Sequence, residues 1–348
     1  MRRFRFAIAA GALLSGAIAA AQPLPAPSAV AASTPAAGST LVPAPPAAAA
    51  PAVPSPRETP LPTYTESAGS EYVLLPVLVF DRKGRFVDGL AKADFRVNAG
   101  GVNVTLDTFE RDDEAPASFA FLVDTSGSMK IAGKLESAKS AIRHILEGRR
   151  AGDDFALFAF AENELSLLSE FSPDPSRVSR ALTHLEAGGR TALFDAVAAT
   201  PSRMLAGKNG KRAILLFTDG VDNASRLSAD EMATILQQVS IPVYAVGMKN
   251  AAFDRLSDAE RKDLALDNLK LLAYTSGGQL FLANGEEDLR PIAAKINTEV
   301  RKQYLLGFAP SGQGELKYRV VVVSVTKPGK WVVRARRGYR GTVPAPAG

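Results

Sequence analysis

The sequence has no cysteine and only two histidines among its 348 residues. The absence of cysteine excludes disulfides, zinc–thiolate sites, cysteine catalysis and a cysteine-linked lipid anchor, so packing alone must hold the fold. Both histidines, His144 and His184, fall in segments with helical spacing. His144 lies off the apolar stripe of its segment, which indicates a solvated side chain rather than a general base.

Motifs of common enzyme classes are also missing. The chain has no Gly-x-Ser-x-Gly elbow, no Gly-Lys-Ser/Thr phosphate loop and no His-Glu-x-x-His zinc helix. We therefore expect a protein that is not an enzyme, and carry an unrecognised hydrolase only as a remote alternative.

A strong net charge is absent as well. The formal charge is +5, and it falls to +2 without Arg2, Arg3 and Arg5 at the start of the chain. Bulk charge therefore favours no particular partner. Residues 316–340 contain eight Lys or Arg and no acid, among them Arg334, Arg336, Arg337 and Arg340. This segment predicts either a solvated, edge-protecting face, which we favour, or a patch for anionic lipid or polysaccharide.

Long apolar runs occur only near the start of the chain. Residues 6–21 are uncharged and end in three alanines, after a basic beginning. This pattern predicts a signal peptide over 1–21, cleaved after Ala21, with an uncleaved anchor as the alternative. We therefore expect a secreted or periplasmic bacterial protein, for which a nucleic-acid partner is not expected.

A proline-rich segment follows, with 12 of the 23 prolines between residues 22 and 62. Such a composition predicts a disordered linker over 22–70, and a flexible tail is expected over 341–348.

From 117 to 304 the sequence alternates apolar runs with helical spacing. We predict strands at 119–124, 154–160, 164–169, 212–218, 241–247 and 279–283. Helices are predicted near 133–147, 176–186, 193–206, 228–239, 256–275 and 286–303. This alternation predicts an α/β fold, a doubly wound, mostly parallel six-stranded sheet with helices on both faces.

The flanking segments, 71–112 and 305–340, are strand-like and too small to fold alone. We expect them to combine into one small β-sandwich-like domain, split by the α/β domain. Its last part is predicted as a hairpin between 318–325 and 331–339, around a turn at 327–330.

Oxygen-bearing side chains cluster after two of the predicted strands. Asp124, Ser126 and Ser128 follow one apolar run, and Asp219 follows another. Thr191 lies in a glycine-rich loop before a helix. Oxygen ligands suit Mg²⁺ and similar hard cations, and ligands bind at the carboxyl edge of such sheets. Helix capping would explain any one of these residues but not all five.

These stretches, Asp-Thr-Ser-Gly-Ser, Gly-Gly-Arg-Thr and Thr-Asp-Gly, resemble the von Willebrand factor type A family and its metal-ion-dependent adhesion site. Residues 71–340 resemble a subgroup of bacterial exported proteins related to it. The resemblance implies that Ser126, Ser128 and Thr191 bind the ion through hydroxyls, and that Asp124 and Asp219 act mainly through water.

The resemblance further implies Mg²⁺, with Mn²⁺ or Ca²⁺ as alternatives, and a protein partner that offers a carboxylate to the ion. Asp195 and Asp222 could orient water in a second shell, although helix capping is favoured for both. We therefore predict a cation-dependent adhesion or interaction module. The alternative is an envelope scaffold in which the ion only stabilises the fold.

Overall fold

The computed structural model describes residues 72–162, 165–248, 259–310 and 317–341. All of them lie in the second of two units of the chain, Thr59–Gly348. The predicted signal peptide over 1–21, the linker over 22–70 and residues 342–348 of the predicted tail lie outside the described residues.

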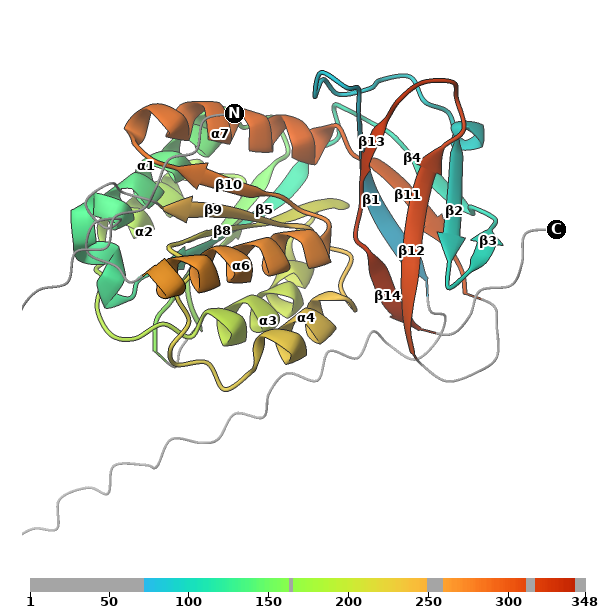
Figure 1. The fold of residues 1–348 in the computed structure, drawn as a ribbon. Helices are drawn as coiled ribbons and strands as arrows, with labels where there is room; N and C mark the ends of the chain where they lie inside the picture. Colours follow the sequence, from blue (N-terminus) through green and yellow to red (C-terminus); the bar gives the residue numbers. More distant parts are fainter. Residues whose placement is uncertain (1–71, 163–164, 249–258, 311–316, 342–348) are drawn as a thin grey trace, which may run out of the picture. The chain divides into compact units, whose positions relative to one another are not determined.

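A six-stranded sheet forms the centre of the α/β domain (Figure 1). Its strands are β5 (Ala117–Asp124), β6 (Asp154–Phe160), β7 (Leu165–Ser172), β8 (Lys211–Thr218), β9 (Val243–Met248) and β10 (Leu280–Ala283). Their order is β10-β9-β8-β5-β6-β7, and every pair is parallel except β6 with β7. The central strands are buried along their whole length, as their continuous apolar runs predict. The predicted fold class is confirmed.

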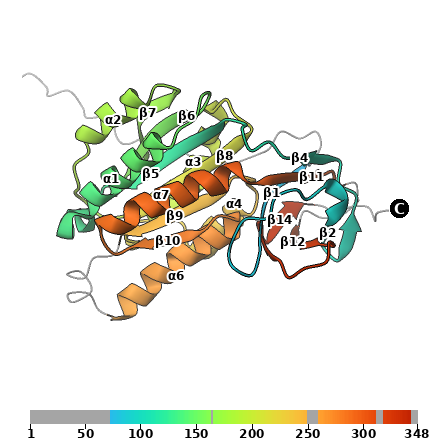
Figure 2. The same cartoon turned by 90° about the horizontal axis from the view of Figure 1, so that it is seen from above.

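Helices cover both faces of this sheet. One core lies under α1 (Lys134–Glu147), α2 (Pro175–Thr183) and α7 (Glu286–Arg301). The other lies under α3 (Leu193–Arg203), α4 (Ala229–Leu236) and α6 (Ala259–Ser276). Figure 2 shows α1 and α7 side by side over the sheet. Among the described residues, none of the helices has the length and apolar character that a membrane span requires.

The two flanks of the α/β domain form two four-stranded sheets. One has the order β13-β1-β11-β4 and the other β14-β12-β2-β3. These strands are β1 (Val73–Phe80), β2 (Phe95–Ala99), β3 (Val102–Val104), β4 (Thr108–Glu110), β11 (Tyr304–Phe308), β12 (Lys317–Val325), β13 (Val332–Arg334) and β14 (Gly338–Gly341). Alternate side chains from both sheets enter one core, which explains why neither flank could fold alone. The predicted sandwich from both flanks is therefore confirmed.

The predicted hairpin between 318–325 and 331–339 is confirmed only in part: residues 319–320 pair antiparallel with 338–339, but residues 332–334 pair with β1 instead. β13 pairs with β1 in the first sheet, whereas β12 pairs with β2 and β14 in the second. The segment after the turn therefore joins one sheet at β13 and returns to the other at β14. Local turn residues favour a hairpin, but they carry no information about a partner strand more than 200 residues earlier.

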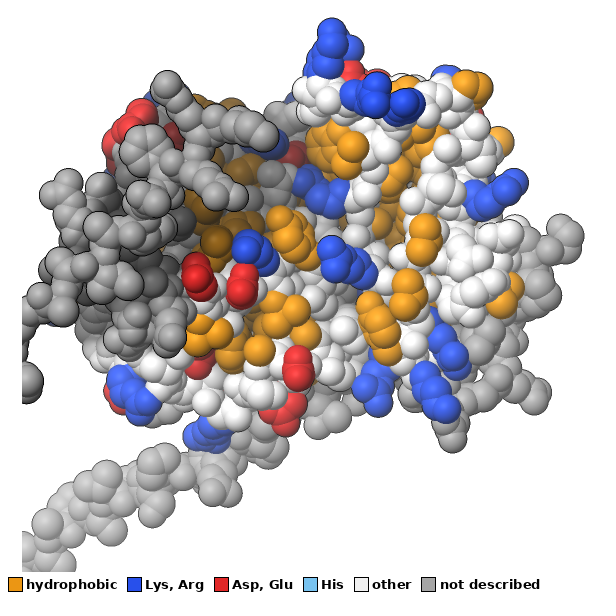
Figure 3. Space-filling model, in the orientation of Figure 1, with side chains coloured by type: hydrophobic (Ala, Val, Ile, Leu, Met, Phe, Trp, Pro, Cys, Tyr) orange, Lys and Arg blue, Asp and Glu red, His pale blue; other side chains and the backbone are white. Residues whose placement is uncertain are grey.

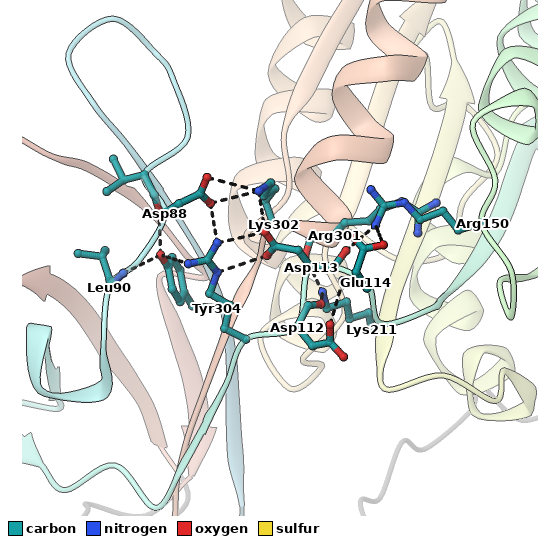
Figure 4. Close-up of polar contacts among 12 residues, drawn as sticks. Asp88, Leu90, Asp112, Asp113, Glu114, Arg150, Lys211, Arg301, Lys302 and Tyr304 are labelled. Carbon is teal, nitrogen blue, oxygen red and sulfur yellow. Dashed lines mark hydrogen bonds and ion pairs between the residues drawn. The ribbon is translucent and has the colours of Figure 1, made fainter.

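The α/β domain passes into the sandwich almost without a loop, since α7 ends at Arg301 and β11 begins at Tyr304. Figure 4 shows the polar contacts at this junction. Lys302 contacts Asp88 and Asp113, and Arg111 bridges the same two carboxylates. These ion pairs tie the end of α7 to two segments on the N-terminal side of the α/β domain, around Asp88 and Arg111.

Candidate metal centre

The predicted site begins where two neighbouring strands end. Asp124 is the last residue of β5, Thr218 is the last residue of β8, and the two strands are paired in parallel. The Thr218 hydroxyl donates to Asp124 Oδ2 at 2.6 Å, and the Ser126 N–H donates to Oδ1 at 2.8 Å. Both oxygens of Asp124 are thus oriented by the fold.

Asp124 is completely buried. Burial, and then the nearby charge of Asp219, raise the pKa of Asp124 to about 6, against the hydrogen bonds from Thr218 and Ser126, which lower it. A buried carboxylate beside a second one is unfavourable unless positive charge lies close by. This electrostatic situation is one that a bound cation would relieve.

The two serines bring their hydroxyls together. Ser126 Oγ lies 3.1 Å from Ser128 Oγ, and Ser126 is almost fully buried. Ser126 is the N-cap residue of the 3₁₀ segment Gly127–Gly133, yet its side chain makes no capping hydrogen bond. Capping, the alternative explanation for this serine, is therefore wrong.

Thr191 reaches the same edge through its loop. Gly188 N donates to Thr125 O at 2.7 Å, and Gly127 N donates to Gly189 O at 2.9 Å. These bonds hold the glycine-rich loop against the segment that contains the serines. Thr191 itself is buried, and its N–H donates to Asn223 Oδ1. Three loops, after β5, before α3 and after β8, therefore meet at one place.

Asp219 is paired with a residue that the motif does not contain. The Lys134 ammonium donates to Asp219 Oδ2 at 2.7 Å, and the two side chains are only 1% and 2% exposed. Lys134 is the first residue of α1. The site thus holds two carboxylates and one fixed cation.

Asp195 and Asp222 both accept hydrogen bonds that connect neighbouring segments of the chain. Asp222 accepts a hydrogen bond from the N–H of Phe194, in the first turn of α3, and from Ser225. Asp195 accepts the N–H groups of Arg226 and Leu227. Asp222 therefore caps a helix from outside, and Asp195 fastens the loop after β8 to α3. The contact of Asp222 agrees with the capping role that the sequence favours, whereas the contacts of Asp195 are with loop residues that precede α4.

The donor set fits a hard divalent cation. Asp124 and Asp219 offer carboxylate oxygens, and the hydroxyls of Ser126, Ser128 and Thr191 are hard, neutral oxygens. Within the described ranges, no group of three or more His, Cys, Asp or Glu residues is placed to hold a metal. A site here would therefore depend on hydroxyls and water, as Mg²⁺ sites with few protein carboxylates do.

Sequence reasoning missed Thr218 and Lys134. Thr218 directly precedes Asp219, so its position at the strand end was visible, but its bond to Asp124 depends on the pairing of β5 with β8. Lys134 precedes the buried residues Ala138 and Ala141 by four and seven positions, on the same helical face. A lysine on an apolar stripe is the signal that could have identified it.

The predicted anionic-surface patch needs correction. Arg336 is only 3% exposed and donates to Val239 O, while Arg334 pairs with Glu299 of α7. Only Arg337 and Arg340 remain exposed. The half-buried Arg334 and the buried Arg336 fasten the sandwich to the α/β domain through Glu299 and Val239.

The exposed face of the second sheet lies along β12 instead. Tyr318, Val320 and Val322 are 42%, 56% and 56% exposed. Figure 3 shows hydrophobic side chains among Lys and Arg on the sandwich side of the molecule.

Part of the chain is similar to a known family of domains. Residues 119–221 match the family model of the von Willebrand factor type A domain. An uncharacterized protein of Borreliella burgdorferi is 25% identical over 142 residues. The uncharacterized protein YfbK of Escherichia coli is 24% identical over 200 residues. These matches cover 38% and 56% of this chain, and it spans only 41% and 34% of the two relatives.

Solved structures are similar at low identity. BatB from Bacteroides thetaiotaomicron is 18% identical with a TM-score of 0.43, over 53% of this chain and 99% of BatB. The von Willebrand factor domain of the type V pili tip protein Mfa5 from Porphyromonas gingivalis is 15% identical with a TM-score of 0.43, over 59% of this chain and 99% of the other. A von Willebrand factor type A protein from Catenulispora acidiphila is 14% identical with a TM-score of 0.41, over 81% and 76% of the two chains. With the family match and the observed sheet, we conclude that this chain contains a von Willebrand factor type A domain.

Proposed function

We propose that this protein is an exported interaction module that binds its partner through a divalent cation. The ion would be held at the loops after β5, before α3 and after β8, and would bridge to a carboxylate of another protein. The observation that carries the proposal is the buried Asp124, placed beside Asp219 and next to the paired hydroxyls of Ser126 and Ser128, of which that of Ser126 makes no capping bond.

Each residue has a separate task in this proposal. Ser126, Ser128 and Thr191 offer neutral oxygens, which bind a cation without cancelling its charge. Asp124 is oriented by Thr218 and by the Ser126 N–H, so its oxygens need little rearrangement. When bound, the ion supplies an open coordination position and residual positive charge, and these attract an acidic side chain. No step of this function requires a nucleophile or a general base.

A scaffold role is the competing function. The sandwich and the α/β domain are joined by ion pairs such as Arg334 with Glu299 and Lys302 with Asp113. A rigid two-part scaffold would need such contacts, and a bound ion would then only stabilise the fold. The two functions differ in whether a partner depends on the ion.

Calorimetric titration of the purified protein with Mg²⁺, Mn²⁺ and Ca²⁺ tests the metal site. We expect saturable binding to the wild type and its loss in Asp124→Asn, which keeps the shape of the side chain. Asp267→Asn, a change at an exposed carboxylate on α6, is the matched control and should bind like the wild type. Equal binding by all three proteins, or by none, would contradict the proposed site.

A pull-down from an extract of envelope proteins, with and without EDTA, then distinguishes the interaction module from the scaffold role. Capture of a partner that depends on the ion and on Asp124 supports the interaction module. Ion binding that raises stability without any ion-dependent partner supports the scaffold.

A further inference from the structure

Lys134 is a cation buried at the place where a divalent ion would bind. Its ammonium lies 2.7 Å from Asp219 Oδ2, and both side chains are almost completely shielded from water. Asp219 also lies close enough to Asp124 for its charge to raise the pKa of that residue. The ammonium, Asp219 and Asp124 therefore belong to one electrostatic cluster.

The backbone keeps Lys134 in this cluster. Ala132 and Gly133 adopt left-handed conformations, with φ of 55° and 71°, and α1 begins at the next residue. A left-handed alanine is strained, so this turn exists because the surrounding structure requires it. It places Lys134 at the first position of α1, above the ends of the parallel strands. The lysine side chain cannot leave the site without exposing its buried stem.

A lysine at this position is energetically unfavourable, so we expect its charge to have a function. The N-terminus of a helix carries partial positive charge, which disfavours a cation in the first turn. Burial adds a desolvation cost that only a close carboxylate can offset. Both costs fall on Lys134, and Asp219 is the carboxylate that offsets them.

We infer that Lys134 is an affinity-setting residue of the site: its fixed charge weakens the binding of a divalent cation and makes that binding depend on an acidic partner. This inference rests on the proposed function. With both carboxylates ionised, Lys134 leaves the empty site with one net negative charge instead of two. A divalent cation then brings the site to one net positive charge, which a carboxylate from the partner neutralises.

Asp219 then has a different role from the water-mediated contact to the ion that its motif implies. One of its oxygens is already bound to Lys134, so it contributes less negative charge to an ion. The ion must rely on Asp124, on the hydroxyls and on a ligand from outside. Partner binding and ion binding thereby become mutually dependent, as thermodynamic linkage requires.

Calorimetric titration with Mn²⁺ and Mg²⁺ at pH 8 tests the inference directly. In Lys134→Gln, the amide can still donate to Asp219 but carries no charge. We expect its dissociation constant for the ion to be lower than that of the wild type by on the order of tenfold. Lys139→Met is the matched control, because Lys139 is another buried lysine of α1, paired with Glu136. Its ion affinity should equal that of the wild type.

A second variant keeps the test decisive if Lys134→Gln does not fold. Replacing both partners, as Lys134→Gln with Asp219→Asn, removes both charges and avoids a buried unpaired ion. The net charge of the site is then unchanged, so the double variant should bind the ion about as tightly as the wild type does.

The outcomes separate this inference from the proposed function. Tighter binding by Lys134→Gln than by the wild type supports it. Wild-type affinity in Lys134→Gln overturns the inference and leaves the proposed metal site intact. Much weaker binding by the double variant also overturns it, because direct ligation by Asp219 would then set the affinity. Absence of binding in every protein overturns both.

Discussion

Arg301 donates hydrogen bonds to both carboxylate oxygens of Asp153, at 3.1 and 2.8 Å, with both side chains buried. The pair joins the last residue of α7 to the loop before β6. Asp153 also accepts the N–H groups of Ala117 and Arg150, so its charge is fully surrounded by donors. Since β11 begins three residues after Arg301, the pair fixes the point where the α/β domain passes into the sandwich.

Loss of this arginine should destabilise the protein strongly. Arg301→Met leaves the Asp153 carboxylate buried without its cation, and we expect the free energy of unfolding to fall by about 3–5 kcal/mol. Denaturant unfolding followed by circular dichroism measures this change. Arg290→Met, on the same helix but at an exposed ion pair, should cost less than about 1 kcal/mol. Similar losses in both variants would contradict the importance of the buried pair.

The same pair predicts a pH dependence. Burial alone would raise the pKa of Asp153, but the hydrogen bonds from Arg301 and from two backbone N–H groups hold it below its ordinary value. A lowered pKa means that the contribution of Asp153 to stability is complete above about pH 4 and is lost as the pH falls through the folded-state pKa. The stability difference between the wild type and Asp153→Asn should therefore shrink on acidification from pH 5 to pH 2. A constant difference would refute this linkage.

Gly220 is predicted to tolerate no side chain. It follows Asp219 with φ of +85°, and a Cβ there would lie 2.6 Å from Ala265 O on α6. Gly84 also has positive φ, at +73°, but nothing lies within 4 Å of a Cβ at that position. Gly84→Ala should cost only the backbone strain, about 1–2 kcal/mol, and Gly220→Ala clearly more. Thermal unfolding of the two variants gives the comparison, and equal midpoints would argue against the close contact.

The hydroxyl of Tyr304 should be worth more than that of an exposed tyrosine. It donates to Val87 O at 2.8 Å and accepts the N–H of Leu90 at 3.2 Å. Tyr304→Phe leaves both backbone groups without this partner inside the sandwich, which should cost about 1–3 kcal/mol. Tyr318→Phe, at a residue 42% exposed, should change stability by less than about 0.5 kcal/mol. Denaturant unfolding measures both values, and a neutral Tyr304→Phe would show that water replaces the hydroxyl.

The sequence predicted the structure correctly where a continuous apolar run or the spacing of apolar residues within one segment determines the element. The apolar runs before Asp124 and Asp219 predicted two buried parallel strands, and both carboxylates consequently lie at the same edge. Helix positions followed from apolar spacing, as for Leu135, Ala138 and Ile142 on α1. In each case the decisive neighbours lie within a few residues or follow from parallel pairing.

The sequence did not predict contacts between residues that lie far apart along the chain. The contact of Arg334 with Glu299 depends on β13 pairing with β1, and a turn at Lys327–Lys330 gives no sign of that pairing. Likewise, the sequence around Arg334 and Arg336 could not reveal that Glu299 of α7 and the carbonyl of Val239 lie against these two side chains. Lys134 escaped notice because its significance comes from Asp219, 85 positions later.

The final prediction concerns an acidic ligand and the ion. If a partner carboxylate completes the coordination of the cation, a simple carboxylate should imitate it in part. Acetate should therefore raise the apparent affinity of the protein for Mg²⁺, whereas acetamide, its uncharged counterpart, should not. Reciprocity requires that Mg²⁺ raise the affinity for acetate by the same factor. Titration with Mg²⁺ at several acetate concentrations, at constant ionic strength, measures this factor.

In Asp124→Asn the effect of acetate should vanish. In Lys134→Gln it should shrink, because the bound ion leaves less positive charge for the carboxylate. An acetate effect that survives in Asp124→Asn would place the carboxylate at another site.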